Sequence, residues 1–352
     1  MMKKLVYMVK TSGKTHIAHF GGAWPTNIGN AFIDLGSLQS LRMAAPAGTV
    51  HLVSELPSWL FRRIDIQSRS MKHRILLKGI EFLNSLLARA RIQNRTTMDR
   101  KQLSGREYVE NCFDLINAMK LDYAVVSGMV FCEEFIKLFG SIFGKLKKNK
   151  VKIIINGGGG LYYSDEEIYR FRKFLERIDP YAIISRDEQT FRSYKDLAEY
   201  SFNGIDCAFF INNWFTPARL VLPRYVILNF DYHPEPELDI HDKLVIRTHH
   251  CCWSNIPKSH FSKHNTLISN LPLDYLNLYA NTDATYSDRV HACVATLAFG
   301  HPYKFYGKTP RAFLLDKVGA TTITHKLTYP NTKKIEKEKE KQLKFLSNIL
   351  AN

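Results

Sequence analysis

Short apolar runs alternate along the chain with longer segments in which apolar residues recur every three or four positions. The short runs predict strands and the longer segments predict helices. Strands are expected at residues 16–20, 50–53, 123–127, 151–156, 182–185, 225–229, 244–247, 266–269, 284–286 and 303–306. Helices are expected at residues 29–41, 72–91, 106–120, 133–143, 165–177, 187–200, 274–281, 290–299 and 311–318. This alternation predicts an α/β protein built on parallel sheets.

One stretch interrupts the alternation and divides the chain in two. Residues 212–224, NNWFTPARLVLPR, contain two prolines and have no clear periodicity. A chain of 352 residues has room for about two domains. We therefore expect an N-terminal Rossmann-like domain over residues 1–215, a C-terminal one over 216–330, and a charged C-terminal helix over 331–352. Two such domains facing a cleft form the architecture of many sugar-modifying transferases.

Positive charge is concentrated in two segments. The chain has 49 Lys and Arg against 33 Asp and Glu, a net charge of +16, which favours an anionic partner. Residues 62–106 carry +9, within an expected basic helical insertion over about 60–106. We favour a core-facing helix with a basic outer face there, and an anionic membrane surface is the alternative. No nucleic-acid motif accompanies the charge, so we expect no nucleic-acid partner.

The second charged segment is the tail. Residues 333–344 add +3, and their alternating Glu and Lys predict a solvated helix. Leu343, Leu346 and Leu350 give this helix only a thin apolar stripe.

Composition limits the class of protein and the cellular compartment that can be expected. The chain is 45% apolar and 23% charged, which excludes a disordered tail protein, a collagen-like repeat and a disulfide miniprotein. Its 6 cysteines have no framework spacing, which favours reduced thiols. The apolar run at residues 5–9 is too short for a signal peptide, and no run is long enough to span a membrane. We expect a cytoplasmic protein, with peripheral attachment to the inner face of the membrane as an option.

Two glycine-rich loops follow predicted strands. The first, residues 20–36, offers Asn27 or Asn30 as the cap of the next helix, with Gly29 between them. The second is Gly157, Gly158, Gly159 and Gly160, where amides can approach an anion, although a tight turn explains the run equally well.

Two further segments place charged groups at helix starts. Arg186 ends one predicted strand, and its forked guanidinium suits phosphate or carboxylate. Arg289 and His291 follow the strand that ends at Ser287 and fall in the first turn of the next helix, near its positive end. Together these residues predict an anion site.

A third segment is rich in metal-ligand residue types. Residues 249–264 hold several His and two Cys, but the cysteines are adjacent and not spaced as Cys-x-x-Cys. We assign no metal ligands.

The motifs, taken in order, resemble the polysaccharide pyruvyl transferase family. The resemblance rests on Asn27-Ile-Gly29, the glycine run at 157–160, Ser185-Arg186-Asp187, and Ser287-Asp-Arg-x-His291 followed by Gly-x-Pro at 300–302. It spans most of residues 20–315, and its Ser-Asp-Arg-x-His motif is the most specific. The family's first loop commonly reads Asn-x-Gly-Asp, whereas this chain has Asn30 at the acidic position.

The resemblance implies a GT-B-like enzyme that moves pyruvate from phosphoenolpyruvate onto a sugar as a cyclic ketal. The sugar would belong to a surface polysaccharide or its lipid-linked precursor, and no cofactor would be needed. Arg186, Arg289 and His291 would bind phosphoenolpyruvate, and His291 is a candidate proton donor. The glycine loops, Asn27, Asn30, Asp206 and Ser287 are expected to line the substrate site.

The base for the sugar hydroxyl is left open among Asp206, Asp231 and His233. Two other functions also stay open. One is a nucleotide-sugar glycosyltransferase that holds a diphosphate at Arg289, and the other is a non-catalytic, membrane-associated binding protein.

Overall fold

A computed structural model describes residues 14–54 and 118–351, except for gaps at 22–23, 25–26, 129–130, 132, 241, 251–262 and 321–325. The expected basic insertion at about 60–106 lies outside the described residues, as do the helix expected at 72–91 and nearly all of that expected at 106–120. Within the described parts, no helix is long and apolar enough to cross a membrane.

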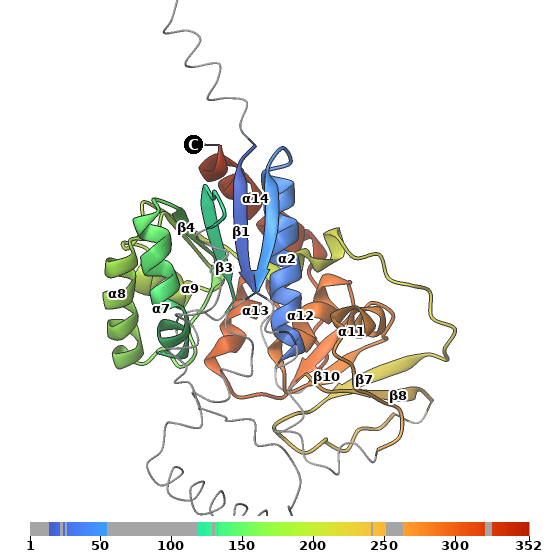
Figure 1. Ribbon diagram of the computed structural model, residues 1–352. Helices are drawn as coiled ribbons and strands as arrows, with labels where there is room; N and C mark the ends of the chain where they lie inside the picture. Colours follow the sequence, from blue (N-terminus) through green and yellow to red (C-terminus); the bar gives the residue numbers. More distant parts are fainter. Residues whose placement is uncertain are drawn as a thin grey trace, which may run out of the picture. The chain divides into compact units, whose positions relative to one another are not determined.

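The first sheet has six strands in the order β2-β1-β3-β4-β5-β6 (Figure 1). Every pairing from β1 to β6 is parallel. The strands are β1 (His16–Gly21), β2 (Thr49–Ser54), β3 (Tyr123–Ser127), β4 (Lys152–Gly158), β5 (Ala182–Ser185) and β6 (Tyr200–Asn203). Strands β3 and β5 are almost wholly buried, as expected of parallel strands covered on both faces.

The second sheet has five strands in the order β11-β10-β7-β8-β9, again all parallel. Its strands are β7 (Tyr225–Asn229), β8 (Leu244–Thr248), β9 (Thr266–Leu267), β10 (Thr285–Ser287) and β11 (Tyr303–Phe305). The expectation of parallel sheets in an α/β protein is therefore confirmed. The irregular stretch at 212–224 falls between the last strand of the first sheet and the first strand of the second.

Helices and short 3-10 turns connect the strands. They are α2 (Ile28–Ala44), α7 (Glu133–Lys148), α8 (Asp165–Ile178), α9 (Glu188–Tyr194), η2 (Cys207–Asn213), α11 (Pro272–Tyr279), α12 (Val290–Ala298), η4 (Pro310–Ala312), α13 (Phe313–Lys317) and α14 (Thr332–Leu350).

One expected helix, over residues 187–200, was wrong in its second half. Helix α9 ends at Tyr194, and residues 200–203 form β6, which extends the sheet beside β5. The pairing with β5 decides the conformation of this short segment, so its own sequence pattern did not reveal a strand.

Helix α2 contacts β1 and β3 of the first sheet and α11 and α12 of the second half. Phe32 packs edge-on against the rings of His250 and Tyr279, which belong to the second half. Gly36 is needed for close approach, because a Cβ atom there would lie 1.9 Å from the carbonyl oxygen of Cys207. Phe32 therefore packs α2 against the second half of the chain, and Gly36 lets the helix approach η2.

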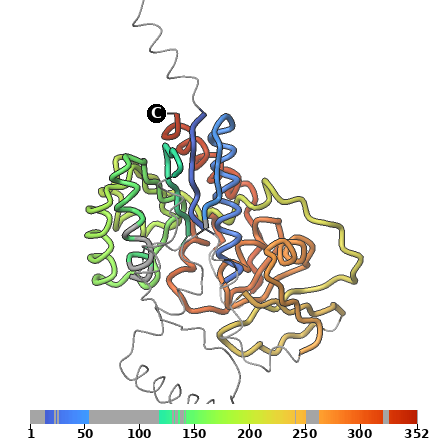
Figure 2. Tube along the Cα trace, in the orientation of Figure 1, coloured from blue at the N-terminus to red at the C-terminus, as the bar shows by residue number. Residues whose placement is uncertain are grey.

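The prediction of a solvated C-terminal helix was wrong for one face of α14. Leu346, Ile349 and Leu350 are buried against the first sheet, where Tyr123 and Tyr181 donate hydrogen bonds to the Ile349 carbonyl. The thin apolar stripe is therefore a packing surface. The tube in Figure 2 shows the chain returning at its C-terminal end to lie beside α2.

Gln342 anchors α14 through buried polar contacts. Its Oε1 accepts a hydrogen bond from the Ile205 backbone N–H at 2.7 Å, and its Nε2 donates to Asn156 Oδ1 at 3.1 Å. Gln342→Ala is expected to lower the free energy of unfolding by about 1–3 kcal/mol, because it leaves buried polar groups unpaired. Urea titration measures this change. Lys344→Ala, at an exposed position of the same helix, is the control, and equal effects of the two substitutions would contradict the anchoring role.

Candidate active site

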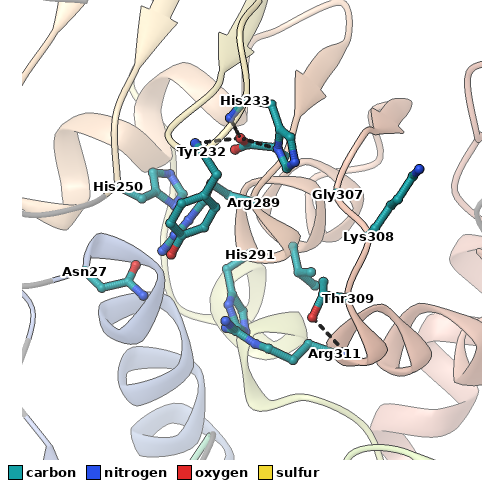
Figure 3. A pocket seen from close by; sticks show the side chains of 12 residues that line it. Asn27, Tyr232, His233, His250, Arg289, His291, Gly307, Lys308, Thr309 and Arg311 are labelled. Carbon is teal, nitrogen blue, oxygen red and sulfur yellow. Dashed lines mark hydrogen bonds and ion pairs between the residues drawn. The ribbon is translucent and has the colours of Figure 1, made fainter. Parts of the chain in front are cut away.

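A cavity of about 110 Å³ opens where the first turn of α2 meets the carboxyl edge of the second sheet (Figure 3). Its lining comes from both halves of the chain and includes most of the cationic side chains singled out from the sequence. The lining residues are Asn27, Tyr232, His233, His250, Asp288, Arg289, Val290, His291, Gly307, Lys308, Thr309 and Arg311.

Three of the predicted residues are linked through their side chains in one buried cluster: Arg186, Asp206 and His291. Arg186 Nη1 donates to Asp206 Oδ2 at 3.1 Å, and His291 Nε2 lies 3.3 Å from the same oxygen. The side chains come from the end of β5, the cap of η2 and the first turn of α12. Arg186 is fully buried and does not line the cavity, whereas His291 does.

The charges of Asp206 and His291 depend on their burial and on the charged groups beside them. Burial would raise the pKa of Asp206, but His291 and Arg186 outweigh it and lower that pKa to about 2. Burial lowers the pKa of His291, and Arg186 and Arg311 add to the decrease while Asp206 opposes it. Because the ionised Asp206 accepts a hydrogen bond from Nε2, the neutral imidazole of His291 carries its proton there and Nδ1 carries none.

Arg289 stands at the start of α12 and is held from two sides. Its Nε lies 3.5 Å from Asp231 Oδ2, and its guanidinium lies 4.6 Å from the ring centroid of Tyr232. Arg289 is the N-cap residue of α12, and its side chain makes no capping hydrogen bond. The positive end of the helix is therefore next to a guanidinium, a favourable place for an anion.

Arg311 is a cationic residue of the cavity lining that was not predicted from the sequence. Burial, together with the nearby guanidiniums of Arg186 and Arg289, lowers its pKa to about 10. Three arginines thus repel one another in one place, and a bound anion would relieve that repulsion. The available sequence signal was Gly307-Lys308-Thr309, which follows β11 at the carboxyl edge of its sheet and continues into η4.

Asp288 and Ser287 organise the backbone around the cavity. Asp288 accepts hydrogen bonds from the backbone N–H groups of Asp231, Tyr232 and His233. Ser287 Oγ accepts from the Arg289 N–H at 2.8 Å and lies 3.0 Å from Asn229 Oδ1. Ser287 is fully buried outside the cavity lining, so its contacts are with the protein.

The first glycine-rich loop contributes through its helix cap. Asn27 caps α2, with Oδ1 accepting from the Gly29 N–H at 3.0 Å, and it lines the cavity. A Cβ atom at Gly29 would lie 3.0 Å from the Cβ atom of His291. Asn30 Oδ1 lies 3.4 Å from Asn27 Nδ2 and is not among the lining residues. The side chain at this position thus supports Asn27.

The second glycine run is not part of the cavity lining. Gly157 has a φ of +68°, and a Cβ atom there would lie 2.8 Å from Cys207 Sγ. The Gly158 carbonyl accepts from the Arg186 N–H at 2.9 Å. A Cβ atom at Gly159 would lie 2.2 Å from Arg186 Nε. The run therefore makes room for Arg186.

The three candidate bases differ in their surroundings. Asp231 accepts from the His250 N–H and lies 3.0 Å from His249 Nδ1. Burial raises the pKa of Asp231, but the hydrogen bond with His249 and the charge of Arg289 help to outweigh burial and lower that pKa. Asp206 is also ionised, and its carboxylate contacts Arg186 and His291. His233 is about half exposed, lines the cavity and lies 3.2 Å from Asp288 Oδ2.

Among the described residues, no group of three or more His, Cys, Asp or Glu is arranged to hold a metal ion. Residues 251–262, most of the His- and Cys-rich stretch, lie outside the described part of the chain.

Solved structures share this fold at low sequence identity. A putative UDP-N-acetylglucosamine 2-epimerase from Listeria monocytogenes is 14% identical with a TM-score of 0.50, and the match covers 97% of this chain and 91% of that one. The S. aureus MnaA-UDP co-structure is 12% identical with a TM-score of 0.50, covering 95% and 91%. A comparison with curated proteins gave no match.

The two parallel sheets and these likenesses define a two-domain, Rossmann-like protein of the GT-B class. The family model "Polysaccharide pyruvyl transferase" matches residues 27–302, most of the chain, and the protein belongs to that family of transferases.

The close approach of Gly159 to Arg186 can be tested directly. Gly159→Ala is expected to lower the free energy of unfolding by about 1–3 kcal/mol, because the added methyl group displaces a buried guanidinium. Gly144→Ala is the matched control, since Gly144 lies in α7 and a Cβ atom there would meet nothing within 4 Å. Chemical denaturation measures both variants. Equal stabilities would show that Arg186 does not need the glycine.

Proposed function

We propose that the protein transfers the pyruvyl group of phosphoenolpyruvate to two hydroxyls of a sugar and releases phosphate. The observation that carries this proposal is the cluster of Arg186, Arg289 and Arg311 around the start of α12, with Arg289 and Arg311 lining the cavity. Phosphoenolpyruvate has a phosphate and a carboxylate, and guanidiniums bind both in forked geometry. Arg186 is outside the cavity lining and would support His291 through Asp206.

The reaction balances without a further cofactor. The methylene carbon C3 gains a proton, which gives C2 cation character, and one sugar hydroxyl attacks C2. The C2–O bond to phosphate then breaks, and the second hydroxyl closes the ketal ring. Of the two hydroxyl protons, one is accounted for by the new methyl group and the other by the released hydrogen phosphate.

His291 is the proposed proton-transfer group. It is neutral in the free protein because burial and the neighbouring arginines disfavour its charged form. A bound anion would offset the arginine charges and raise its pKa, so that His291 could take up a proton and deliver it to C3. Asp206 would stabilise the imidazolium. His233, oriented by Asp288, is the proposed base for a sugar hydroxyl because Asp206 and Asp231 are engaged in buried ion pairs.

The proposed acceptor is a saccharide of a surface polysaccharide or its lipid-linked precursor. Membership of the family supports this class of acceptor. A peripheral position on the inner face of the membrane would suit a lipid-linked acceptor and is part of the proposal.

Incubation with phosphoenolpyruvate and a panel of glycans tests the function. The expected result is phosphate release that matches the gain of one pyruvate ketal per acceptor. Turnover of a nucleotide sugar without use of phosphoenolpyruvate would instead support a glycosyltransferase. Binding of glycans without turnover of either donor would support a non-catalytic relative.

Arg311→Ala should raise the KM for phosphoenolpyruvate about 10- to 100-fold, because it removes a charged partner worth about 1.5–3 kcal/mol. Steady-state phosphate release measures this change. Arg192→Ala is the matched control, since Arg192 is an exposed arginine whose partner is Glu188 on the same helix, and its KM should stay within about twofold. An unchanged KM in Arg311→Ala would remove Arg311 from the donor site.

A further inference from the structure

His250 is a buried histidine of the cavity that has no part in the donor site described above. It lies two residues beyond the end of β8, lines the cavity, and is 1% exposed. Its backbone is held at both ends, because its N–H donates to Asp231 Oδ2 and its carbonyl accepts from the Ile28 N–H at the start of α2. The residue is therefore fixed where the two halves of the chain meet.

Within the described part of the chain, the ring of His250 is held by a hydrogen bond at one of its two nitrogens. Nε2 lies 2.7 Å from the Tyr279 hydroxyl, which in turn lies 3.0 Å from Thr248 Oγ1. The edges of Phe32 and Tyr275 pack against the ring. Nδ1 is buried and has no hydrogen-bond partner among the residues that the structure describes, which is costly for a polar atom unless a ligand supplies one.

Burial also sets the charge of the ring. The pKa of His250 is lowered to about 3 by burial, with Asp231 opposing the decrease and Arg289 adding to it. The imidazole is therefore neutral at physiological pH. A neutral nitrogen beside arginines is a poor competitor for phosphate or carboxylate, and it suits an uncharged polar group.

We propose that His250 Nδ1 binds a hydroxyl of the saccharide acceptor and so helps to orient it next to the arginine-bound donor. A hydroxyl both donates and accepts, so it can pair with Nδ1 in either neutral tautomer, whereas a carboxylate or phosphate oxygen can only accept. The assignment of the hydroxyl to an acceptor rests on the proposed pyruvyl transfer.

Two substitutions at this one position separate the two ring nitrogens. The Gln amide reaches the position of Nε2 and keeps the Tyr279 contact, but it leaves nothing at Nδ1. The Asn amide is close to the position of Nδ1 and loses the Tyr279 contact. His250→Gln is expected to raise the acceptor KM about tenfold, the loss of one hydrogen bond, with the phosphoenolpyruvate KM unchanged. His250→Asn should keep the acceptor KM within about threefold.

Three outcomes of the kinetic comparison would overturn the inference. One is an acceptor KM in His250→Gln equal to that of the wild type. The second is a higher KM for phosphoenolpyruvate, which would assign His250 to the donor site. The third is an equal rise of acceptor KM in both variants together with lower urea midpoints, which would mean that His250 acts only through the fold.

A binding experiment separates this inference from the pyruvyl-transfer proposal. Saturation-transfer NMR on the full chain would use the methyl pyranosides of galactose, glucose, mannose and N-acetylglucosamine as probes. Saturation transfer to at least one probe with the wild type, reduced in His250→Gln and kept in His250→Asn, supports the role of His250 even if phosphoenolpyruvate is not turned over. The absence of binding by every probe, or equal binding by wild type and His250→Gln, would overturn it even if pyruvyl transfer occurs.

Discussion

The buried ion pair between Arg186 and Asp206 is the constraint on which the rest of the site depends. Both side chains are fully buried, and removing one partner of such a pair would leave an uncompensated charge at a cost of about 3–5 kcal/mol. Asp206 also caps η2 and lies near His291 Nε2, so one carboxylate connects β5, η2 and α12. The position of the candidate proton-transfer group is thereby coupled to the first sheet, although His291 itself belongs to the second half.

Close backbone packing makes this connection possible. Gly159 leaves space for the Arg186 guanidinium, Gly36 lets α2 rest on the Cys207 carbonyl, and Gly29 lets the start of α2 approach His291. Each of these glycines faces a protein neighbour. Gly29 brings the start of α2 close to His291 of the second half, whereas Gly36 and Gly159 make room for neighbours within the first half. Cationic side chains and the start of α12 line the cavity that the two halves share.

Much of the fold and part of the site followed from sequence patterns. Strands such as β3, β5 and β7 were predictable because buried parallel strands are short and uniformly apolar, while β6 depends on pairing with β5. Arg289 and His291 were recognisable because they start a helix after a strand. Arg311 and His250 were not, since their importance comes from neighbours distant in sequence. The apolar stripe on α14 was too thin to predict packing from the sequence. The surface that it contacts, the first sheet, is formed by residues distant in the sequence.

Isothermal titration calorimetry of the wild-type protein with phosphoenolpyruvate, inorganic phosphate and pyruvate tests the central claim most directly. If the arginine cluster holds both anionic groups of one ligand, phosphoenolpyruvate should bind at least about tenfold more tightly than phosphate or pyruvate. Equal affinities for phosphoenolpyruvate and phosphate, or no binding of phosphoenolpyruvate, would contradict a site organised around that donor.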